Sequence, residues 1–240
     1  MEINGNILFA KMIIIKDRFS ATDVKQVTTS VPIENKIQNN TDFHKLLQTK
    51  KIMIDGVFIK EMVQKGNEAE EKVTMELGNL SLTQLNWKTS EECWSIGQCL
   101  DHLVISDCLY FPVFKTISTG KYKLSFWESW SPFSGFFGRM LINQVQEKPV
   151  KKIKTPKIFS PSESNIDAGI TDRFHKHLNT LLDYIAQCNK ADIDKVHITS
   201  PVSKIVTYNL RRAITILMLH EHRHINQAIK IKAAKDFPFQ

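Results

Sequence analysis

His220-Glu221-His222-Arg223-His224 lies inside a helical pattern that runs from about residue 208 to residue 233. On a helix that turns by about 100° per residue, His220 and His224 differ by about 40° and share one face, one turn apart. Four small or apolar residues fall in the same sector: Ala213, Leu217, Ala228 and Ile231. Because a buried polar group without a bond costs free energy, two imidazoles on this face need partners, and one metal ion serves both.

The same stretch also has the form H-E-x-x-H, which is a zinc-protease signature. Such proteases take their next ligand, a Glu, His or Asp, from downstream of the motif. Only sixteen residues follow His224; they include no Glu or His, and Asp236 is their sole acid. The sequence therefore disfavours metalloprotease chemistry and places the third ligand upstream.

The upstream candidates for a third ligand are His44, His102, His175, His177 and His197. His102 fits best, because it lies in a second helical pattern about two turns after the capping box formed by Ser95 and Gln98. His175 and His177 neighbour charged residues, and at most one of them faces inward. Three neutral imidazoles leave a coordination position open, as catalytic zinc sites do. Cys99 is an alternative fourth ligand, but we interpret it as a buried apolar residue.

Four long helical patterns predict an all-α fold. They cover about residues 56–77, a segment from Ser95 with a late kink at Pro112, residues 166–188 and residues 208–233. An extended stretch at residues 198–206 predicts a short strand or a loop. We expect residues 51–235 to form the bundle domain and residues 1–50 to form an N-terminal extension.

An aromatic-rich insertion, residues 120–164, separates the second and third helical patterns. Six aromatic residues lie within twelve positions: Phe126, Trp127, Trp130, Phe133, Phe136 and Phe137. A basic amphipathic segment with aromatic anchors can lie on a membrane. We favour a lid that folds over the end of the bundle and buries these aromatics.

Composition limits the remaining function classes. The 240 residues include 32 Lys and Arg against 25 Asp and Glu, for a net charge of +7. Four lysines, Lys151, Lys152, Lys154 and Lys157, gather at the end of the insertion. We interpret the basic excess as solvated surface and expect neither nucleic-acid binding nor membrane contact. The four cysteines form no C-x-x-C pair, which favours a reducing, cytoplasmic location.

Several segments together resemble the DinB-like superfamily, which includes bacillithiol transferase-like and metal-dependent hydrolase-like proteins. They are Leu82-Thr83-Gln84-Leu85-Asn86-Trp87, Trp94-Ser95-Ile96-Gly97-Gln98, Asp101-His102-Leu103 and His220-Glu221-x-Arg223-His224-x-x-Gln227-Ala228. The resemblance covers about residues 53–233. It implies a four-helix bundle, usually a homodimer, in which His102, His220 and His224 hold a divalent metal.

The resemblance also implies that the metal activates a low-molecular-weight thiol or water. We expect a metal-dependent thiol S-transferase or hydrolase acting on a small molecule, or alternatively a metal-binding stress or interaction module without turnover. Zn or Ni is expected at the site, with Mn or Fe as alternatives. We interpret Trp94 as core packing and Gln227 either as a partner of a ligand or as a group that packs between helices. Glu221 lies about 100° from His220 and is therefore not assigned as the proton-transfer group.

Overall fold

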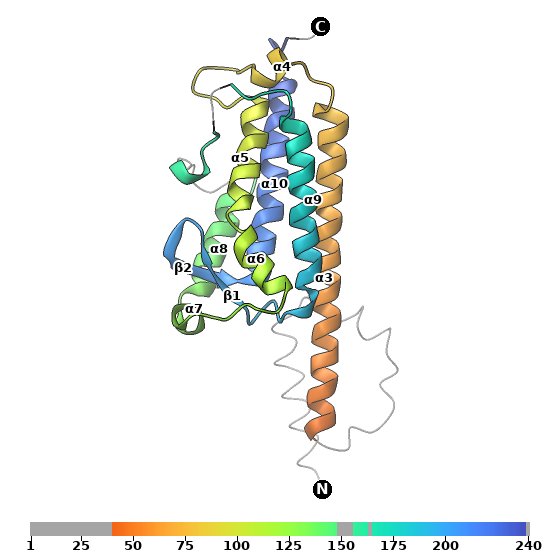
Figure 1. Cartoon of the computed structure of the whole chain (residues 1–240), viewed down its shortest axis with the longest axis vertical. Helices are drawn as coiled ribbons and strands as arrows, with labels where there is room; N and C mark the ends of the chain where they lie inside the picture. The colour runs from red at the N-terminus through yellow and green to blue at the C-terminus, as the bar shows by residue number, and fades with distance from the viewer. Residues whose placement is uncertain (1–39, 148–155, 163–164, 239–240) are drawn as a thin grey trace. The chain divides into compact units, whose positions relative to one another are not determined.

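The structure is a computed structural model that describes residues 40–147, 156–162 and 165–238 (Figure 1). The chain divides into two compact units, Met1–Gly56 and Val57–Gln240. The described residues of the first unit, 40–56, belong to helix α3 (Asn40–Leu77). The rest of the predicted N-terminal extension, residues 1–39, lies outside the described residues.

The chain is mostly helical, as predicted for the all-α class. After α3 the described helices are α4 (Leu82–Asn86), α5 (Ile96–Cys108), α6 (Phe111–Ser118), α7 (Phe126–Trp130), α8 (Ser134–Val145), α9 (Ile170–Gln187) and α10 (Leu210–Lys232). The described residues also form two short 3-10 helices, η1 (Lys157–Phe159) and η2 (Cys188–Lys190). One small antiparallel sheet consists of β1 (His197–Ser200) and β2 (Ser203–Asn209).

In the second unit, the part of α3 after Gly56 lies alongside α5, α9 and α10 (Figure 1). Helix α5 contacts both α9 and α10. The part of α3 after Gly56 is tied to α10 by Lys72, which donates a 2.6 Å hydrogen bond to Asn226. It is also tied to α9 by Asn179, which donates a 2.8 Å bond to Glu70. These contacts hold α5 and α10, which carry the predicted ligands, against each other.

The apolar faces of these helices are fully buried against one another. Seven examples from α5, α9 and α10 are 0–1% exposed: Leu100, Leu103, Phe174, Leu178, Leu181, Ile214 and Leu217. Burying one such side chain stabilises the fold by about 1.5–3 kcal/mol. The core therefore fixes the register of α5 against α10.

Capping residues determine where α5 and α10 begin. The predicted capping box is confirmed: the Ser95 hydroxyl accepts from the Gln98 backbone N–H, and the Gln98 side chain accepts from the Ser95 N–H. Helix α10 begins at Leu210, because the Asn209 side chain accepts from the Arg212 N–H and caps it. The extended stretch before it is a β-hairpin whose second strand leads directly into α10.

Three predicted helix boundaries were wrong. The first helix begins at Asn40 instead of about Gly56, because the side chains of residues 44–54 are all exposed or half-buried and leave no apolar stripe to reveal it. Pro112 does not kink a continuous helix; α5 ends at Cys108, and Pro112 lies in the first turn of α6. A proline in the first turn loses no hydrogen bond, because the N–H groups there have no partner within the helix.

The third helix, predicted from about residue 166, begins at Ile170. The Asn86 side chain explains the delay. Its oxygen accepts a 2.7 Å hydrogen bond from the Ile166 N–H, and its nitrogen donates a 2.8 Å bond to the Ile166 carbonyl. This pair of bonds uses the backbone groups of Ile166 and holds the residue in the loop before α9.

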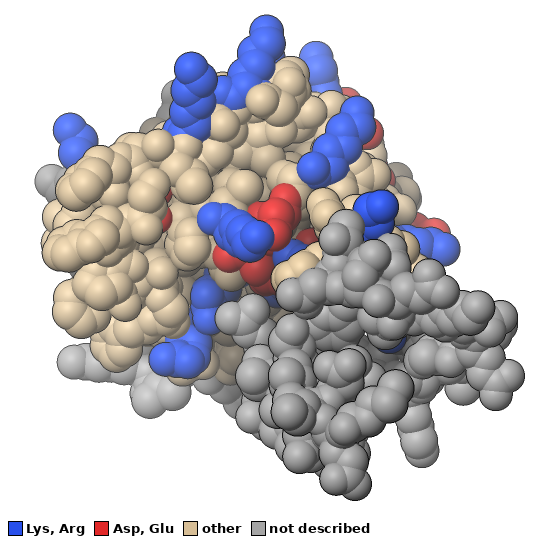
Figure 2. Space-filling view, turned by 90° about the horizontal axis from the view of Figure 1, so that it is seen from below, with Lys and Arg blue, Asp and Glu red and all other residues tan. Residues whose placement is uncertain are grey.

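The insertion is only partly the lid that we predicted. Helix α8 contacts α10 and β2, and its residues Leu141 and Val145 line a cavity. Burial of all the aromatics was wrong, since Phe126 is 81% exposed and Trp130 is 68% exposed. Figure 2 views the end of the molecule where α7 lies and shows a broad uncharged area with Lys and Arg side chains around it. Lys151, Lys152 and Lys154 lie outside the described residues.

Among the described residues, the helices are either too short or too polar for a transmembrane segment.

Candidate metal centre

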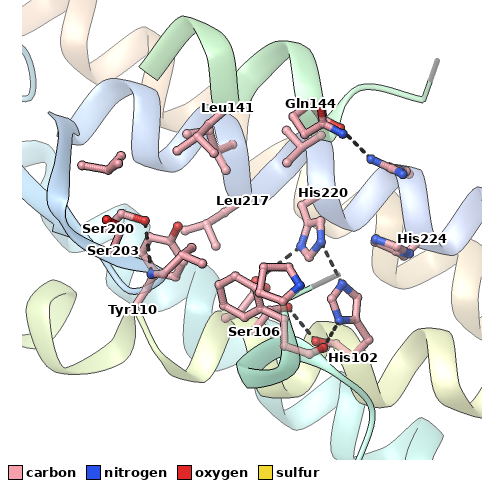
Figure 3. Close-up of a pocket in the computed structure, with 18 of the residues that line it drawn as sticks. His102, Ser106, Tyr110, Leu141, Gln144, Ser200, Ser203, Leu217, His220 and His224 are labelled. Atoms are coloured by element: carbon pink, nitrogen blue, oxygen red, sulfur yellow. Dashed lines mark hydrogen bonds and ion pairs between the residues drawn. The ribbon is translucent and has the colours of Figure 1, made fainter. Parts of the chain in front are cut away.

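One histidine from α5 and two from α10 meet in the interior of the second unit (Figure 3). Side-chain nitrogens of His102, His220 and His224 all lie within 4.8 Å of one another. The Nε2 atoms of His102 and His220 are 3.0 Å apart. We call these residues the three-histidine cluster. The structure thus brings together the three side chains that the sequence predicted as ligands.

The alternative third ligands are not part of this cluster. His175 lies on the side of α9 that faces α3, with its Nδ1 atom 3.2 Å from a Glu70 carboxylate oxygen. His197 belongs to β1, and its Nδ1 atom lies 3.0 Å from the Lys195 carbonyl oxygen. His44 belongs to the first unit. His177 is buried and takes part in a different cluster, described below.

Hydrogen bonds fix the proton on two of the three rings. Nδ1 of His102 contacts the carbonyl oxygen of Phe159 in η1, and Nδ1 of His224 lies 3.0 Å from Oε1 of Gln227. Because these oxygens can only accept, each Nδ1 is the protonated nitrogen. Nε2 of each ring then keeps its lone pair, which is the form in which imidazole binds a metal. The interpretation of Gln227 as a partner of a ligand fits this contact.

Trp94 packs against the core, as interpreted from the sequence, and it also covers the three-histidine cluster. Its ring centre lies 4.7 Å from that of His102 and 5.7 Å from that of His224. Trp94 immediately precedes the N-cap of α5, so the start of this helix places the indole beside the imidazoles. The side chain restricts ring rotation and keeps water from this side of the cluster.

Burial keeps all three imidazoles neutral. His102 is 2% exposed and His224 is 6% exposed. Desolvation, reinforced by the nearby Arg223 charge, lowers the pKa of His102 and lowers the pKa of His224 to about 3. Desolvation and the neighbouring imidazoles set the pKa of His220 well below its usual value. The cluster therefore presents uncharged nitrogen donors at neutral pH.

The cluster stands at the wall of a cavity of about 270 Å³. Much of the wall is apolar and comes from α8, the hairpin and α10, including Leu141, Val145 and Leu217. Arg223 also lines it and donates a 2.7 Å hydrogen bond to the Gln144 carbonyl. Because His102, His220 and His224 all line this cavity, a small molecule inside it would lie beside their rings.

Comparison with known families assigns residues 67–228 to the DinB superfamily. The chain belongs to the DinB superfamily. The matched segment includes every residue of the three-histidine cluster, and it confirms the resemblance seen in the sequence motifs. Comparisons with curated proteins and with solved structures give no match.

This DinB-superfamily protein has a second group of ligand-type side chains next to the first. Donor atoms of Asp107, His177 and Glu221 lie within 4.8 Å of one another. Asp107 and Glu221 are 0% exposed, and His177 is 6% exposed. Neither carboxylate has a hydrogen-bond partner among the described residues, and the same holds for Nε2 of His177. We call these three residues the Asp107 cluster.

Sequence reasoning missed the Asp107 cluster, although a signal for it existed. From the sequence, Glu221 is a candidate only for proton transfer beside His220. Its neighbours at helical spacing, Ile214, Met218 and Ile225, are apolar and buried. That pattern places the Glu221 carboxylate inside the core. Asp107 and His177 come from other helices, and no local spacing connects them to Glu221.

Cys99 is not a ligand of the three-histidine cluster. The residue is 0% exposed, and burial raises the pKa of its thiol far above the usual range. Its sulfur is also not among the donor atoms that lie together with the three histidine rings. Its interpretation as a buried apolar residue therefore fits the structure.

Proposed function

We propose that this protein is a metal-dependent enzyme in which His102, His220 and His224 hold one divalent ion at the cavity wall. The observation that carries the proposal is the arrangement of donors: three neutral imidazoles whose ring nitrogens converge, two of them with Nδ1 already bonded to an oxygen acceptor. As part of the proposal, α3, α5, α9 and α10 form the four-helix bundle that positions these residues.

The donor set fits a first-row divalent ion. Nitrogen ligands about 2.1 Å from one ion lie about 3.0–3.4 Å apart, and the Nε2 atoms of His102 and His220 are 3.0 Å apart. A set of imidazoles suits Zn or Ni best, and Mn or Fe are alternatives. When bound there, the ion would lower the pKa of a thiol or water reaching it from the cavity.

The residues around the histidines orient the ligands and restrict access. Gln227 and the Phe159 carbonyl hold the His224 and His102 rings with Nε2 toward the centre. Trp94 closes one side. The site is therefore approached through the cavity, where a reactive thiolate would be shielded from bulk water.

Two features of the cavity support a small thiol as substrate. The volume of about 270 Å³ suits a small molecule rather than a polymer. Arg223 places a positive charge at the wall, close enough to the histidines to depress their pKa values. A low-molecular-weight thiol that carries a carboxylate would pair with this guanidinium, while an apolar electrophile would occupy the Leu141 and Leu217 side.

A metal-binding module without turnover is the second candidate. One observation favours it: among the described residues that line the cavity, Asp107 and Arg223 are the only Asp, Glu, Lys or Arg residues. Few groups other than the three histidines could therefore transfer a proton there. Burial also raises the pKa of Tyr110, another lining residue, well above its usual range, so that its phenol is a poor proton donor. If the protein is an enzyme, its substrate would therefore have to lose its proton without help from a side chain in the cavity.

Turnover with different thiols separates the two candidates. The full chain is loaded with Zn or Ni and supplied with electrophiles and a series of small thiols, some with and some without a carboxylate. We expect metal-dependent consumption of at least one carboxylate-bearing thiol, lost in His224→Ala and kept in His175→Ala, whose imidazole lies outside both clusters. Full metal loading without turnover of any thiol or of water would favour the binding module.

The remaining expectations belong to the same proposal. We propose a homodimer, because the family resemblance implies one, and size-exclusion chromatography with light scattering measures it directly. We also propose that the chain acts in the cytoplasm on a small molecule and binds neither nucleic acid nor membranes.

A further inference from the structure

The Asp107 cluster contains buried polar atoms that the fold leaves without bonds. Both oxygens of Asp107, both oxygens of Glu221 and Nε2 of His177 have no hydrogen-bond partner among the described residues. A buried, unsatisfied group costs about 1–3 kcal/mol, and more if it is charged. Five such atoms gathered within one small volume indicate that a component is held there.

One shared proton satisfies only part of this cluster. Two adjacent carboxyl groups can hold a proton between them, and burial together with the Asp107 charge raises the pKa of Glu221 well above its usual range. That proton bonds one oxygen of each residue. The other two oxygens and the His177 nitrogen stay without partners, since His177 Nε2 and Asp107 Oδ2 are 3.6 Å apart, too far for a hydrogen bond.

The same distances fit a metal ion between the three side chains. Two ligands on a tetrahedral ion, each about 2.1 Å from it, lie about 3.4 Å apart. The separation of 3.6 Å between His177 Nε2 and Asp107 Oδ2 is close to this value. Phe111 stacks on the His177 ring with centres 4.9 Å apart and an interplanar angle of 14°, which fixes the plane of the ring, and Nδ1 lies 3.5 Å from Sγ of Cys108.

We propose that Asp107, His177 and Glu221 form a second divalent-metal site next to the three-histidine cluster. Two carboxylates and one imidazole neutralise a divalent ion, and this donor set is harder than three imidazoles. The site is therefore expected to prefer Mn²⁺ or Fe²⁺ more strongly than the three-histidine cluster does. Asp107 lines the cavity, which gives an ion a path to the cluster.

The two sites are adjacent through Asp107 and His220. Asp107 Oδ1 lies 4.0 Å from Nδ1 of His220, and Nε2 of the same ring faces His102. One carboxylate oxygen thus faces a member of the three-histidine cluster, while the other faces His177. The second site is inferred from its own residues and does not depend on the proposed enzyme activity.

Metal stoichiometry tests the proposal. The full chain is freed of metal with a chelator, equilibrated by dialysis against Mn²⁺ alone or Zn²⁺ alone, and analysed by elemental analysis. We expect about two equivalents per chain in wild type and about one in Glu221→Gln and in His177→Leu. The matched control His175→Leu, on the same helix as His177, keeps two equivalents. Circular dichroism and thermal unfolding verify that each variant folds.

A second variant keeps the test decisive if the core substitutions fail to fold. His224→Ala removes a ligand from the three-histidine cluster only, and we expect it to retain one equivalent with a stronger preference for Mn²⁺ over Zn²⁺ than wild type. The variant His224→Ala/Glu221→Gln retains none. One equivalent in wild type and none in His224→Ala would overturn the proposal and assign the Asp107 cluster to a proton-sharing carboxyl pair.

Discussion

The three-histidine cluster and the Asp107 cluster share helices α5 and α10, and His220 and Glu221 are consecutive residues. In the first cluster, two Nδ1 atoms are bonded to oxygen acceptors and the Nε2 atoms converge. In the second, the buried donor atoms have no hydrogen-bond partners among the described residues. A ligand set whose rings are already oriented by hydrogen bonds thus lies beside a set whose donor atoms have no hydrogen bonds. We expect the two sets to respond differently to metal, pH and substitution.

Replacing a histidine of the first cluster has the largest expected effect. His102→Ala, His220→Ala and His224→Ala each remove one of three nitrogen donors, so we expect loss of the metal equivalent bound there and loss of any metal-dependent turnover. Elemental analysis and activity measurements check this. If all three variants keep wild-type metal content and His175→Ala loses it, the ligand set is wrong.

Lowering the pH is expected to destabilise the metal-free protein through His224, a member of the three-histidine cluster. The pKa of His224 in the folded protein is about 3, below the usual value of 6.5. A lowered histidine pKa means that the unfolded chain binds the proton first as pH falls. The stability linked to this group is complete above about pH 6.5 and is lost as pH falls toward 3. Urea unfolding of metal-free protein at several pH values measures the loss, and a shallower slope is expected in His224→Ala.

Glu221→Gln is expected to have opposite effects on thermal stability in the absence and in the presence of metal. Without metal, the substitution removes a carboxyl group whose pKa burial raises, so it stabilises the fold near pH 7 by about 1–3 kcal/mol. With Mn²⁺ present, it removes a ligand, so stabilisation by the ion declines. Thermal unfolding with and without Mn²⁺ shows this reversal. A melting temperature that rises equally in both conditions would contradict a metal in the Asp107 cluster.

The smallest expected effect is at Gln227, which touches a ligand but not the ion. Gln227→Ala removes the acceptor for Nδ1 of His224, and we expect metal affinity to fall by about 10-fold. Gln227→Glu restores an acceptor and should recover most of the affinity. Competition with a chromophoric chelator measures both variants. Equal affinities of wild type and Gln227→Ala would mean that His224 is oriented by packing alone.

The predictable part of the site is the part encoded by local spacing. His220 and His224 are one turn apart on a helix, and the capping box fixes where α5 begins, so both could be read from the sequence. The contact of Trp94 with His102 could not, because it depends on the direction of the chain before the cap. Asp107 and His177 meet only through the packing of α5 against α9.

The errors in the predicted fold have a similar physical origin. Apolar periodicity revealed helices only where one face is buried, which is why the exposed start of α3 was missed. Pro112 signalled a disturbance, but a proline favours the start of a new helix as well as a kink. The exposed Phe126 and Trp130 show that aromatic content alone does not predict burial.

Anomalous diffraction at the absorption edge of the bound metal tests the central claim most directly. For crystals of the full chain grown with Zn²⁺, we predict a peak bounded by the Nε2 atoms of His102 and His224 and by a ring nitrogen of His220. A zinc peak located elsewhere, with these nitrogens bonded only to one another or to water, would contradict the account.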